Sequence, residues 1–486
     1  MKCTRFTIRY CLCTATLSAL VILGCAPEKP SEEAGATAAK AGLGLTLLVV
    51  DDPQMAAEIE ALRAEWKART GSELTIAQAT VREVIGGQEP SAADAIIYPS
   101  RLLGTLIERK GITSLPAEYA TNHELAWSDT FELLQIAETT WAREPHAVPF
   151  GSPVLTLYAR SDLLEKARKE LPRDWHAYHE LADLLGRREN LDDKAPPANS
   201  PWQGSLQPLA EGWAGRVLLA RAAPYVKHRD HFSALFDIET MDPLIAGEGF
   251  VRALEELVAD YKLGTPEQIV MDPAAVREAF LAGQSALAIT WPAHADDSAP
   301  STHVATVLAE LPGAGVVFNL PDKSWEKRQD RESPHVPMLG LAGRLGSITT
   351  NASHPQQALQ LLAWLSGREW GVRVSSASRA TTLYRRTQMR TPQPWVDAGT
   401  DTAAATAYAN SVQAALSRQQ YLAVPRIPGE AEYMASLDDA TRRVLRQEES
   451  PAEALAEVAV RWREITDRLG RDRQKAAYRA SLEFER

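Results

Sequence analysis

Charged and aromatic side chains that could bind a small polar molecule follow two apolar runs of this sequence. Asp51 and Asp52 come directly after the run GLTLLVV, and Tyr98 and Arg101 lie at the end of the run DAIIY. A carboxylate or a guanidinium can form two hydrogen bonds with neighbouring polar groups, which suits the binding of a polar ligand. Each residue also has a structural interpretation: one aspartate could cap the next helix, and Tyr98 and Arg101 could serve packing alone.

Residues that could support catalysis or metal binding do not form a recognisable pattern. His228 and His231 have helix-like spacing, but no third ligand is near them in the sequence, which indicates a solvated surface. The sequence has no P-loop, G-x-S-x-G or H-E-x-x-H motif, and the glycine-rich stretch 340–347 lacks a nucleotide-binding context. We therefore expect no enzyme activity, no cofactor and no metal site.

The elements that must position these residues follow an α/β pattern. Gly44 to Val50 reads as a buried strand, and Met55, Ile59, Leu62 and Trp66 form one face of the helix after it. Further strands are expected over 74–79, 94–98 and 285–291. Further helices are expected over 101–109, 175–185, 211–222, 249–261, 272–283, 354–370 and 450–469. Residues 187–208 contain many turn formers and read as a loop, and alternating strands and helices imply parallel sheets.

All four cysteines lie at the start of the chain, and the last of them is Cys25. A basic head and an apolar stretch of about 14 residues, too short to span a membrane, predict a signal peptide over 1–25. The stretch Ile22-Leu23-Gly24-Cys25 resembles the lipobox of bacterial lipoproteins, which implies cleavage before Cys25 and lipidation of its thiol. The alternative is an ordinary signal peptide in which Cys25 is incidental. The mature chain would have neither a free thiol nor a disulfide, and residues 26–43 would form a flexible tether.

Composition limits the partners of this chain. Its net charge is −11, and removal of residues 1–25, which hold three basic and no acidic residues, changes this to −11 − 3 = −14. Such a charge argues against nucleic acid or an anionic membrane surface as a partner. The apolar fraction of 45% is that of an ordinary globular protein, and the length suggests two or three structural units.

Six segments in order resemble the family 1 extracellular solute-binding proteins of bacterial ABC importers. They are LTLLVVDDPQMAAEIEALRAEWKARTGSELTI, ADAIIYPSRLLGTLIERKGITSLP, AVPFGSPVLTLYARSDLLEKA, LPRDWHAYHELADLL, AAVREAFLAGQSALAITWPA and RIPGEAEYMASLDDATRRVLRQEESPAEALAEVAVRWREI. The resemblance implies a type II periplasmic-binding-protein fold with two lobes, each a mainly parallel sheet flanked by helices. Lobe one would comprise 44–150 plus 343–376, and lobe two 151–342 plus 377–486. The three crossings of the hinge would lie near Pro149–Leu155, Met338–Arg344 and Ser375–Thr382.

The resemblance also implies a ligand site in the cleft between the lobes. A sugar there needs flat aromatic faces for its C–H surface and fixed polar groups for its hydroxyls. Besides the four residues named first, the expected cleft residues are Ser152, Trp202, Glu211, Trp213, Trp291, Gly340 and Tyr433. Trp291 is the leading candidate, Gly340 would meet a backbone requirement, and the others could equally be structural.

The implied function is that of a monomeric, lipid-anchored receptor on the periplasmic or outer face of a bacterial membrane. It would deliver a sugar or oligosaccharide to the membrane subunits of an ABC importer. Alternatives are a receptor for a polyamine, which Asp51, Asp52 and Glu211 could bind, a glycoside-active enzyme, and a scaffold lipoprotein without a ligand. An iron receptor would need clustered tyrosine or acidic ligands, which the sequence does not show. The loop after Ser375 lacks a proline common in the family, and the segment 187–208 is unlike most members.

Overall fold

The first sheet is built around the apolar run that precedes Asp51. The computed structural model describes residues 44–87, 91–293 and 304–483, and the first sheet has the strand order β2-β1-β3-β14-β6. Its strands are β1 (Gly44–Val50), β2 (Glu73–Ala79), β3 (Ala95–Pro99), β6 (Val148–Pro149) and β14 (Arg344–Ile348). β1 pairs in parallel with β2 and β3, whereas β14 is antiparallel to β3 and to β6.

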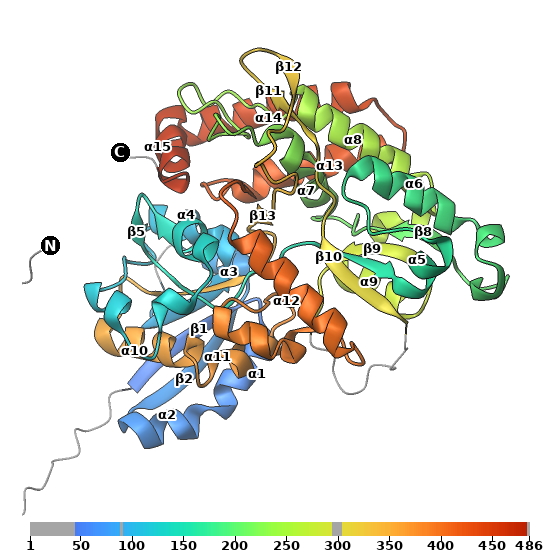
Figure 1. Cartoon of the computed structure of the whole chain (residues 1–486). Coiled ribbons are helices and arrows are strands. Elements are labelled where there is room, and N and C mark those ends of the chain that lie inside the picture. The colour runs from blue at the N-terminus through green and yellow to red at the C-terminus, as the bar shows by residue number, and fades with distance from the viewer. Residues whose placement is uncertain (1–43, 88–90, 294–303, 484–486) are drawn as a thin grey trace, which may run out of the picture. The chain divides into compact units, whose positions relative to one another are not determined.

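Both faces of β1 are covered, as its unbroken apolar sequence predicts. Leu45, Leu47 and Val49 face a core that includes α1 (Pro53–Ala61), α2 (Arg63–Thr70) and α10 (Pro355–Ser366). Leu48 and Val50 face the opposite core, where α4 (Leu103–Glu108) packs (Figure 1). The four predicted apolar residues of the first helix are all buried, although the helix is interrupted at Leu62 between α1 and α2. Alternation over two faces explains why the side chains of this strand are apolar at every position from Leu47 to Val50.

The second sheet has the strand order β10-β7-β9-β8. Its strands are β7 (Thr156–Arg160), β8 (Gln203–Leu206), β9 (Ser285–Thr290) and β10 (Thr306–Glu310). β7 is antiparallel to both β9 and β10, and the β8–β9 pair is parallel. The structure therefore corrects the expectation that each sheet is mainly parallel, because both sheets also contain antiparallel pairs. Strands that return from the other sheet, such as β7 and β14, do not belong to strand–helix–strand crossovers and can run in the opposite direction.

The segment 187–208, expected to be a loop, contributes β8 to this sheet. β8 has the sequence QGSL, which lacks the β-branched and aromatic residues typical of strands. It is placed by packing against α6 (Trp175–Gly186), because a Cβ at Gly204 would lie 1.9 Å from the Ala182 carbonyl oxygen. The strand therefore depends on a tertiary contact that its own sequence does not reveal.

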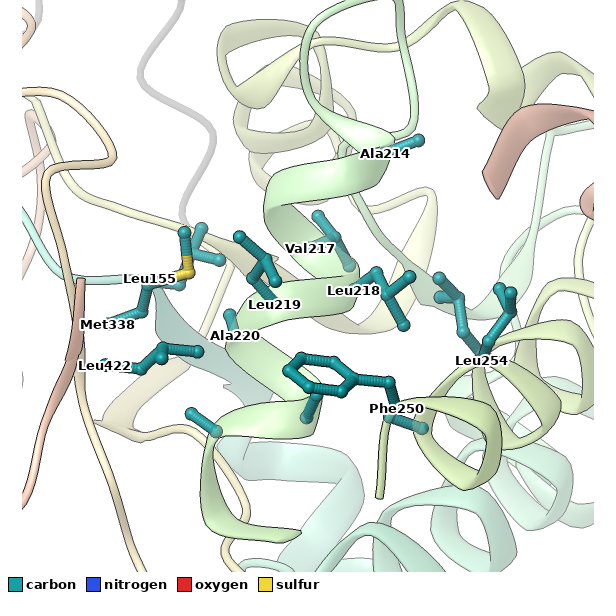
Figure 2. Packing of buried hydrophobic residues seen from close by; sticks show 14 of the residues in the cluster. Leu155, Ala214, Val217, Leu218, Leu219, Ala220, Phe250, Leu254, Met338 and Leu422 are labelled. Carbon is teal, nitrogen blue, oxygen red and sulfur yellow. The ribbon is translucent and has the colours of Figure 1, made fainter. Parts of the chain in front are cut away.

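Helix α7 (Ala214–Val226) joins several parts of the hydrophobic core. Figure 2 shows Leu219 and Ala220 on the side of Leu155, Met338 and Leu422, with Leu218 directed toward Leu254 of α8 (Glu248–Tyr261). The helix begins later than predicted, at Ala214, because Gly212 has a φ of +81° and ends the preceding turn. This packing fixes the start of α7, where Trp213 and Arg216 lie.

The remaining elements surround these two sheets. The other helices are α3 (Val81–Gly86), α5 (Ser161–Ala167), α9 (Pro273–Leu281), α11 (Gly371–Ala377), α12 (Thr402–Leu416), α13 (Glu430–Leu445), α14 (Pro451–Leu469) and α15 (Arg471–Ser481). The other strands are β4 (Thr140–Trp141), β5 (Glu144–Pro145), β11 (Val316–Asn319), β12 (Ser324–Lys327), β13 (Met338–Leu339) and β15 (Leu422–Ala423). No helix among the described residues is long and apolar enough to cross a membrane.

Three segments of the described chain connect the first sheet and the helices on it to the elements around the second sheet. Residues 150–155 connect β6 of the first sheet to β7 of the second, and residues 340–343 connect β13 to β14. After α11, residues 378–401 lead to α12, which packs in the core on β10. The predicted signal peptide, the tether and Cys25 lie outside the described residues.

Candidate functional site

A polar cavity of about 540 Å³ lies where α7 and α13 meet the residues that follow β3. Arg101, in the short 3-10 helix Ser100–Leu102 after β3, lines it from the first sheet. Glu211 in the turn before α7, Arg216 in the first turn of α7 and Glu430 at the start of α13 line it from the other side. The cavity therefore brings together two predicted residues, Arg101 and Glu211, with charged residues that the sequence patterns did not single out.

Glu430 is the buried centre of an ion cluster in this cavity. Its Oε1 lies 3.8 Å from Nε of Arg101 and 3.7 Å from Nη2 of Arg216. Burial raises the pKa of Glu430, and the two guanidinium groups oppose that shift. Burial also lowers the pKa of Arg216, which Glu430 in turn opposes. One buried carboxylate thus faces two cations in a poorly hydrated position.

Asp438 ties α13 to the start of α7. Its two carboxylate oxygens accept hydrogen bonds from the backbone N–H groups of Gly212, at 2.9 Å, and Gly215, at 3.0 Å. A Cβ at Gly215 would lie 2.9 Å from the backbone nitrogen of Asp438, so the two helices approach closely here. Burial raises the pKa of Asp438, while the two backbone hydrogen bonds act against it. This carboxylate positions the cavity wall.

Two of the predicted tryptophans form a pair behind Arg216 of the cavity wall; Trp291 is buried in the core, and neither ring lines the cavity itself. The rings of Trp213 and Trp291 have centroids 5.3 Å apart at an interplanar angle of 47°. The guanidinium of Arg216 lies over the Trp213 ring, 5.4 Å from its centroid. Nε1 of Trp291 donates a hydrogen bond to the Arg379 carbonyl oxygen at 3.0 Å, in the third segment between the sheets. The pair therefore connects the cavity wall to that segment.

Asp51 and Asp52 take different roles at the end of β1. Asp52 is buried, and its carboxylate caps α1 by accepting from the Met55 N–H at 3.1 Å. The same carboxylate accepts from Nε of Arg344 at 2.8 Å and from the Ser378 hydroxyl at 2.5 Å. The capping interpretation of Asp52 is therefore confirmed. Asp51 is exposed with a φ of +49°, and its carbonyl oxygen accepts from Arg344 at 2.9 Å.

Ser152 and Gly340 meet at a buried carboxylate that the sequence patterns did not indicate. The Ser152 hydroxyl donates to Glu138 Oε2, and the Gly340 N–H donates to Glu138 Oε1 at 3.2 Å. Nη1 of Arg426 donates to the Glu138 carbonyl oxygen at 2.9 Å. Burial raises the pKa of Glu138, which these hydrogen bonds and Arg426 oppose. Gly340, with a φ of +77°, meets the predicted backbone requirement, and Ser152 joins two of the connecting segments.

Three predicted site residues lie in the core rather than at the cavity. Tyr98 is fully buried, and its hydroxyl lies 2.8 Å from the Ser347 hydroxyl. Tyr433 is also fully buried, and its hydroxyl lies 2.9 Å from the Thr466 hydroxyl. Trp202 is half-buried against the core and donates from Nε1 to the Leu185 carbonyl oxygen at 3.1 Å. Each polar atom is already satisfied within the fold, so we leave these three residues out of the candidate site.

The helical register of α13 could have pointed to the missed residues. Glu430, Met434 and Asp438 repeat at intervals of four and line the cavity, whereas Tyr433 lies on the core side of the same helix. The segment PGEAEYM therefore contributes to the site, but through Glu430 rather than through Tyr433. Arg216 could have been found by helical register too, since it lies three residues after Trp213 and therefore near the same face.

The histidines and acids of the described residues form no group of three or more that could hold a metal ion. The rings of His228 and His231 are tilted at 31° with centroids 4.9 Å apart, and His228 lies 3.2 Å from a carboxylate oxygen of Glu326. His228 is buried rather than solvated, which corrects that part of the expectation. The pair belongs to the contact between the β11–β12 hairpin and the end of α7.

The class of two-lobed binding proteins is defined by two sheets with helices packed on them, three connecting segments and a polar cavity lined from both sides. Residues 52–372 match the bacterial extracellular solute-binding protein family, and the chain belongs to this family. Both the predicted family and the α/β fold class are therefore confirmed. The comparison with curated protein sequences gave no match.

Solved structures with the same fold cover most of this chain. An ABC transporter solute binding protein from Agrobacterium radiobacter K84, in complex with ribitol, is 17% identical with a TM-score of 0.64, over 87% of this chain and 99% of that one. Maltose-bound MalE3 of T. maritima is 16% identical with a TM-score of 0.62, over 87% and 100%. The sugar-binding protein MalE of Xanthomonas citri is 16% identical with a TM-score of 0.63, over 88% and 98%. At sequence identities this low, the structural similarity establishes the fold of this chain.

Proposed function

We propose that this chain captures a carbohydrate in the cavity between α7, α13 and Arg101 and delivers it to an ABC importer. The observation that carries the proposal is a charged cavity of about 540 Å³ whose wall residue Arg216 packs on the half-buried ring of Trp213. Aromatic faces suit the C–H surface of a sugar, and fixed charged groups suit its hydroxyls. Family membership and the ribitol and maltose named for the structural neighbours support this assignment.

The proposed lobes are those expected from the sequence, 44–150 with 343–376 and 151–342 with 377–486. Binding would draw the lobes together about the three connecting segments, since Arg101 lines the cavity from one side and Glu430 from the other. The ligand would favour closure by its higher affinity for the closed form, which the importer would recognise. We propose a monomer that binds its ligand without changing it chemically.

A polyamine receptor is the second candidate, because Glu211, Glu430 and Asp439 line the cavity. Arg101 and Arg216 argue against it, since both guanidinium groups face the same buried carboxylate that a polyamine would need. Asp51 and Asp52, the other acids of that hypothesis, make a helix cap and an Arg344 contact instead. The arrangement therefore favours a polyol or sugar over a polycation.

Thermal stability of the purified full chain, measured with and without sugars, sugar alcohols and polyamines, tests this function. A ligand at about a hundred times its Kd adds about 2.7 kcal/mol to the free energy of unfolding, so it raises the Tm measurably. We expect a saccharide or polyol to raise the Tm, and Trp213→Ala to remove that increase. Trp325→Ala, in the β11–β12 hairpin away from the cavity, is the matched control. A shift with polyamines alone would favour the second candidate.

The membrane anchor is proposed from the sequence around Cys25, which lies outside the described residues. We expect the full chain, expressed in a bacterial host, to fractionate with membranes and to incorporate labelled fatty acid. Cys25→Ser should abolish the label, because the thiol is the proposed site of acylation. Equal labelling of the variant would remove the anchor from the proposal and leave ligand binding unaffected.

A further inference from the structure

The ion cluster around Glu430 holds more positive than negative charge. Glu430 is 4% exposed, and the two guanidinium groups of Arg101 and Arg216 approach the same oxygen atom. The separations of 3.8 and 3.7 Å exceed the 2.7–2.9 Å of a charge-assisted hydrogen bond. The two cations are therefore held near one carboxylate without being hydrogen-bonded to it.

Hydrogen-bonding capacity is left unused on all three side chains of the cluster. Among the residues that the structure describes, Arg101 Nη1, Arg216 Nε and Glu430 Oε1 are buried atoms without a hydrogen-bond partner. Arg216 uses Nη1 to donate to the Gly212 carbonyl oxygen, which orients its Nε within the cavity wall. Buried polar atoms are nearly always paired, so unpaired donors on two adjacent arginines indicate a missing acceptor.

The other acids of the cavity already have partners or lie at its open end. Asp438 accepts two backbone hydrogen bonds from the start of α7. Asp439 pairs with Arg443 at 2.5 Å, and Glu211 is exposed to solvent. The charge of Asp438 acts on Arg216, but among the described residues no carboxylate of the cavity accepts a hydrogen bond from Arg101 or Arg216.

We propose that the missing acceptor is a carboxylate of the ligand, so that the bound carbohydrate is a sugar acid. This inference rests on the proposed function and specifies the ligand class of the same cavity. A carboxylate accepts up to four hydrogen bonds and would take them from Arg101 and Arg216, while Glu430 accepts from a neighbouring sugar hydroxyl. One negative charge balances the excess of one positive charge in the cluster, whereas a phosphate group near Glu430 would exceed it.

Calorimetric titration of the full chain with matched pairs of sugars tests this assignment. The pairs are galactose with galacturonate and glucose with glucuronate, and glucose 6-phosphate distinguishes a phosphate from a carboxylate. We expect one uronate to bind at least about tenfold more tightly than its neutral parent. Arg216→Gln and, separately, Arg101→Gln should each remove that preference, while Arg461→Gln on the exposed face of α14 should keep it.

The outcomes separate this inference from the proposed function. Equal or tighter binding of the neutral sugars would overturn the sugar-acid assignment and leave the proposed function in place. Tighter binding of glucose 6-phosphate than of either uronate would also overturn the carboxylate assignment. Absence of binding by every neutral sugar and every uronate would overturn both. Because the Arg216 side chain is less exposed (14%) than that of Arg101 (23%), Arg101→Gln keeps the test decisive if Arg216→Gln does not fold.

Discussion

Asp52 illustrates how one side chain at the residue scale holds several elements. It caps α1, pairs with Arg344 at the start of β14, and accepts from Ser378 beyond α11. We expect Asp52→Ala to lower the free energy of unfolding by about 3–5 kcal/mol, because it leaves the buried Arg344 without its charge partner. Denaturant titration measures this loss.

Asp51→Asn provides the matched control for Asp52. Asp51 is exposed, and asparagine tolerates its φ of +49° as well as aspartate does. The control should change stability by less than about 0.5 kcal/mol. Equal effects of the two substitutions would contradict the role assigned to Asp52.

The lowered pKa of Glu326 predicts that the free energy of unfolding depends on pH. Hydrogen bonds from Asn319, His228 and Arg229 lower its pKa from 4.5 to about 2. A group whose pKa is lower in the folded state stabilises the fold above its unfolded pKa and loses that contribution as the pH falls through the folded value. We expect wild type to exceed Glu326→Gln in stability above pH 4.5, with the difference narrowing as the pH falls toward about 2.

Urea titrations at a series of pH values measure this difference. Glu464→Gln, in an exposed ion pair with Arg461 on α14, is the control and should have little effect at any of these values. A wild-type advantage over Glu326→Gln that stays constant across the series would contradict the assignment.

The segments that connect the two sheets approach each other too closely for a side chain at Gly343. Gly343 has a φ of +102°, and a Cβ there would lie 2.0 Å from Oγ of Ser152 in another connecting segment. We expect Gly343→Ala to cost about 2–4 kcal/mol, because backbone strain and steric overlap add. Gly315→Ala is the control, since a Cβ there meets no atom within 4 Å. Similar midpoints of urea unfolding for the two variants would refute this account of the connecting segments.

At the scale of the molecule, the proposed function requires the two lobes to close around the ligand. Arg101 and Glu430 belong to opposite sides of the cavity and already lie 3.8 Å apart. We expect small-angle scattering to show a smaller radius of gyration when a ligand identified by thermal shift is added. An unchanged scattering curve at saturation would show that binding occurs without hinge closure.

The sequence predicted those parts of the fold that local periodicity specifies. The β1 strand and the helix face of Met55, Ile59, Leu62 and Trp66 were recovered because burial leaves a period of two or of 3.6 in the sequence. Capping aspartates marked helix starts in the same way, because they bond to backbone groups within three residues.

Predictions that depended on side-chain direction were less complete. The fold places Arg101 and Glu211 in the cavity lining. It places Trp213 and Trp291 beside the cavity. Tyr433 does not reach the cavity, because it lies about 60° around the helix from Glu430, on the side away from Met434 and Asp438 and toward the core. Aromatic residues are the ones that cores use most, so their presence near a site does not fix the face that they occupy.

The sequence by itself determined the family, the α/β class and the order of the principal elements, since these follow from short-range patterns and matching segments. Tertiary structure alone decided the antiparallel entry of β14, the strand β8 and the cluster of Arg101, Arg216 and Glu430. The physical reason is that pairing and desolvation join residues far apart in the chain, and neither leaves a trace in the local sequence.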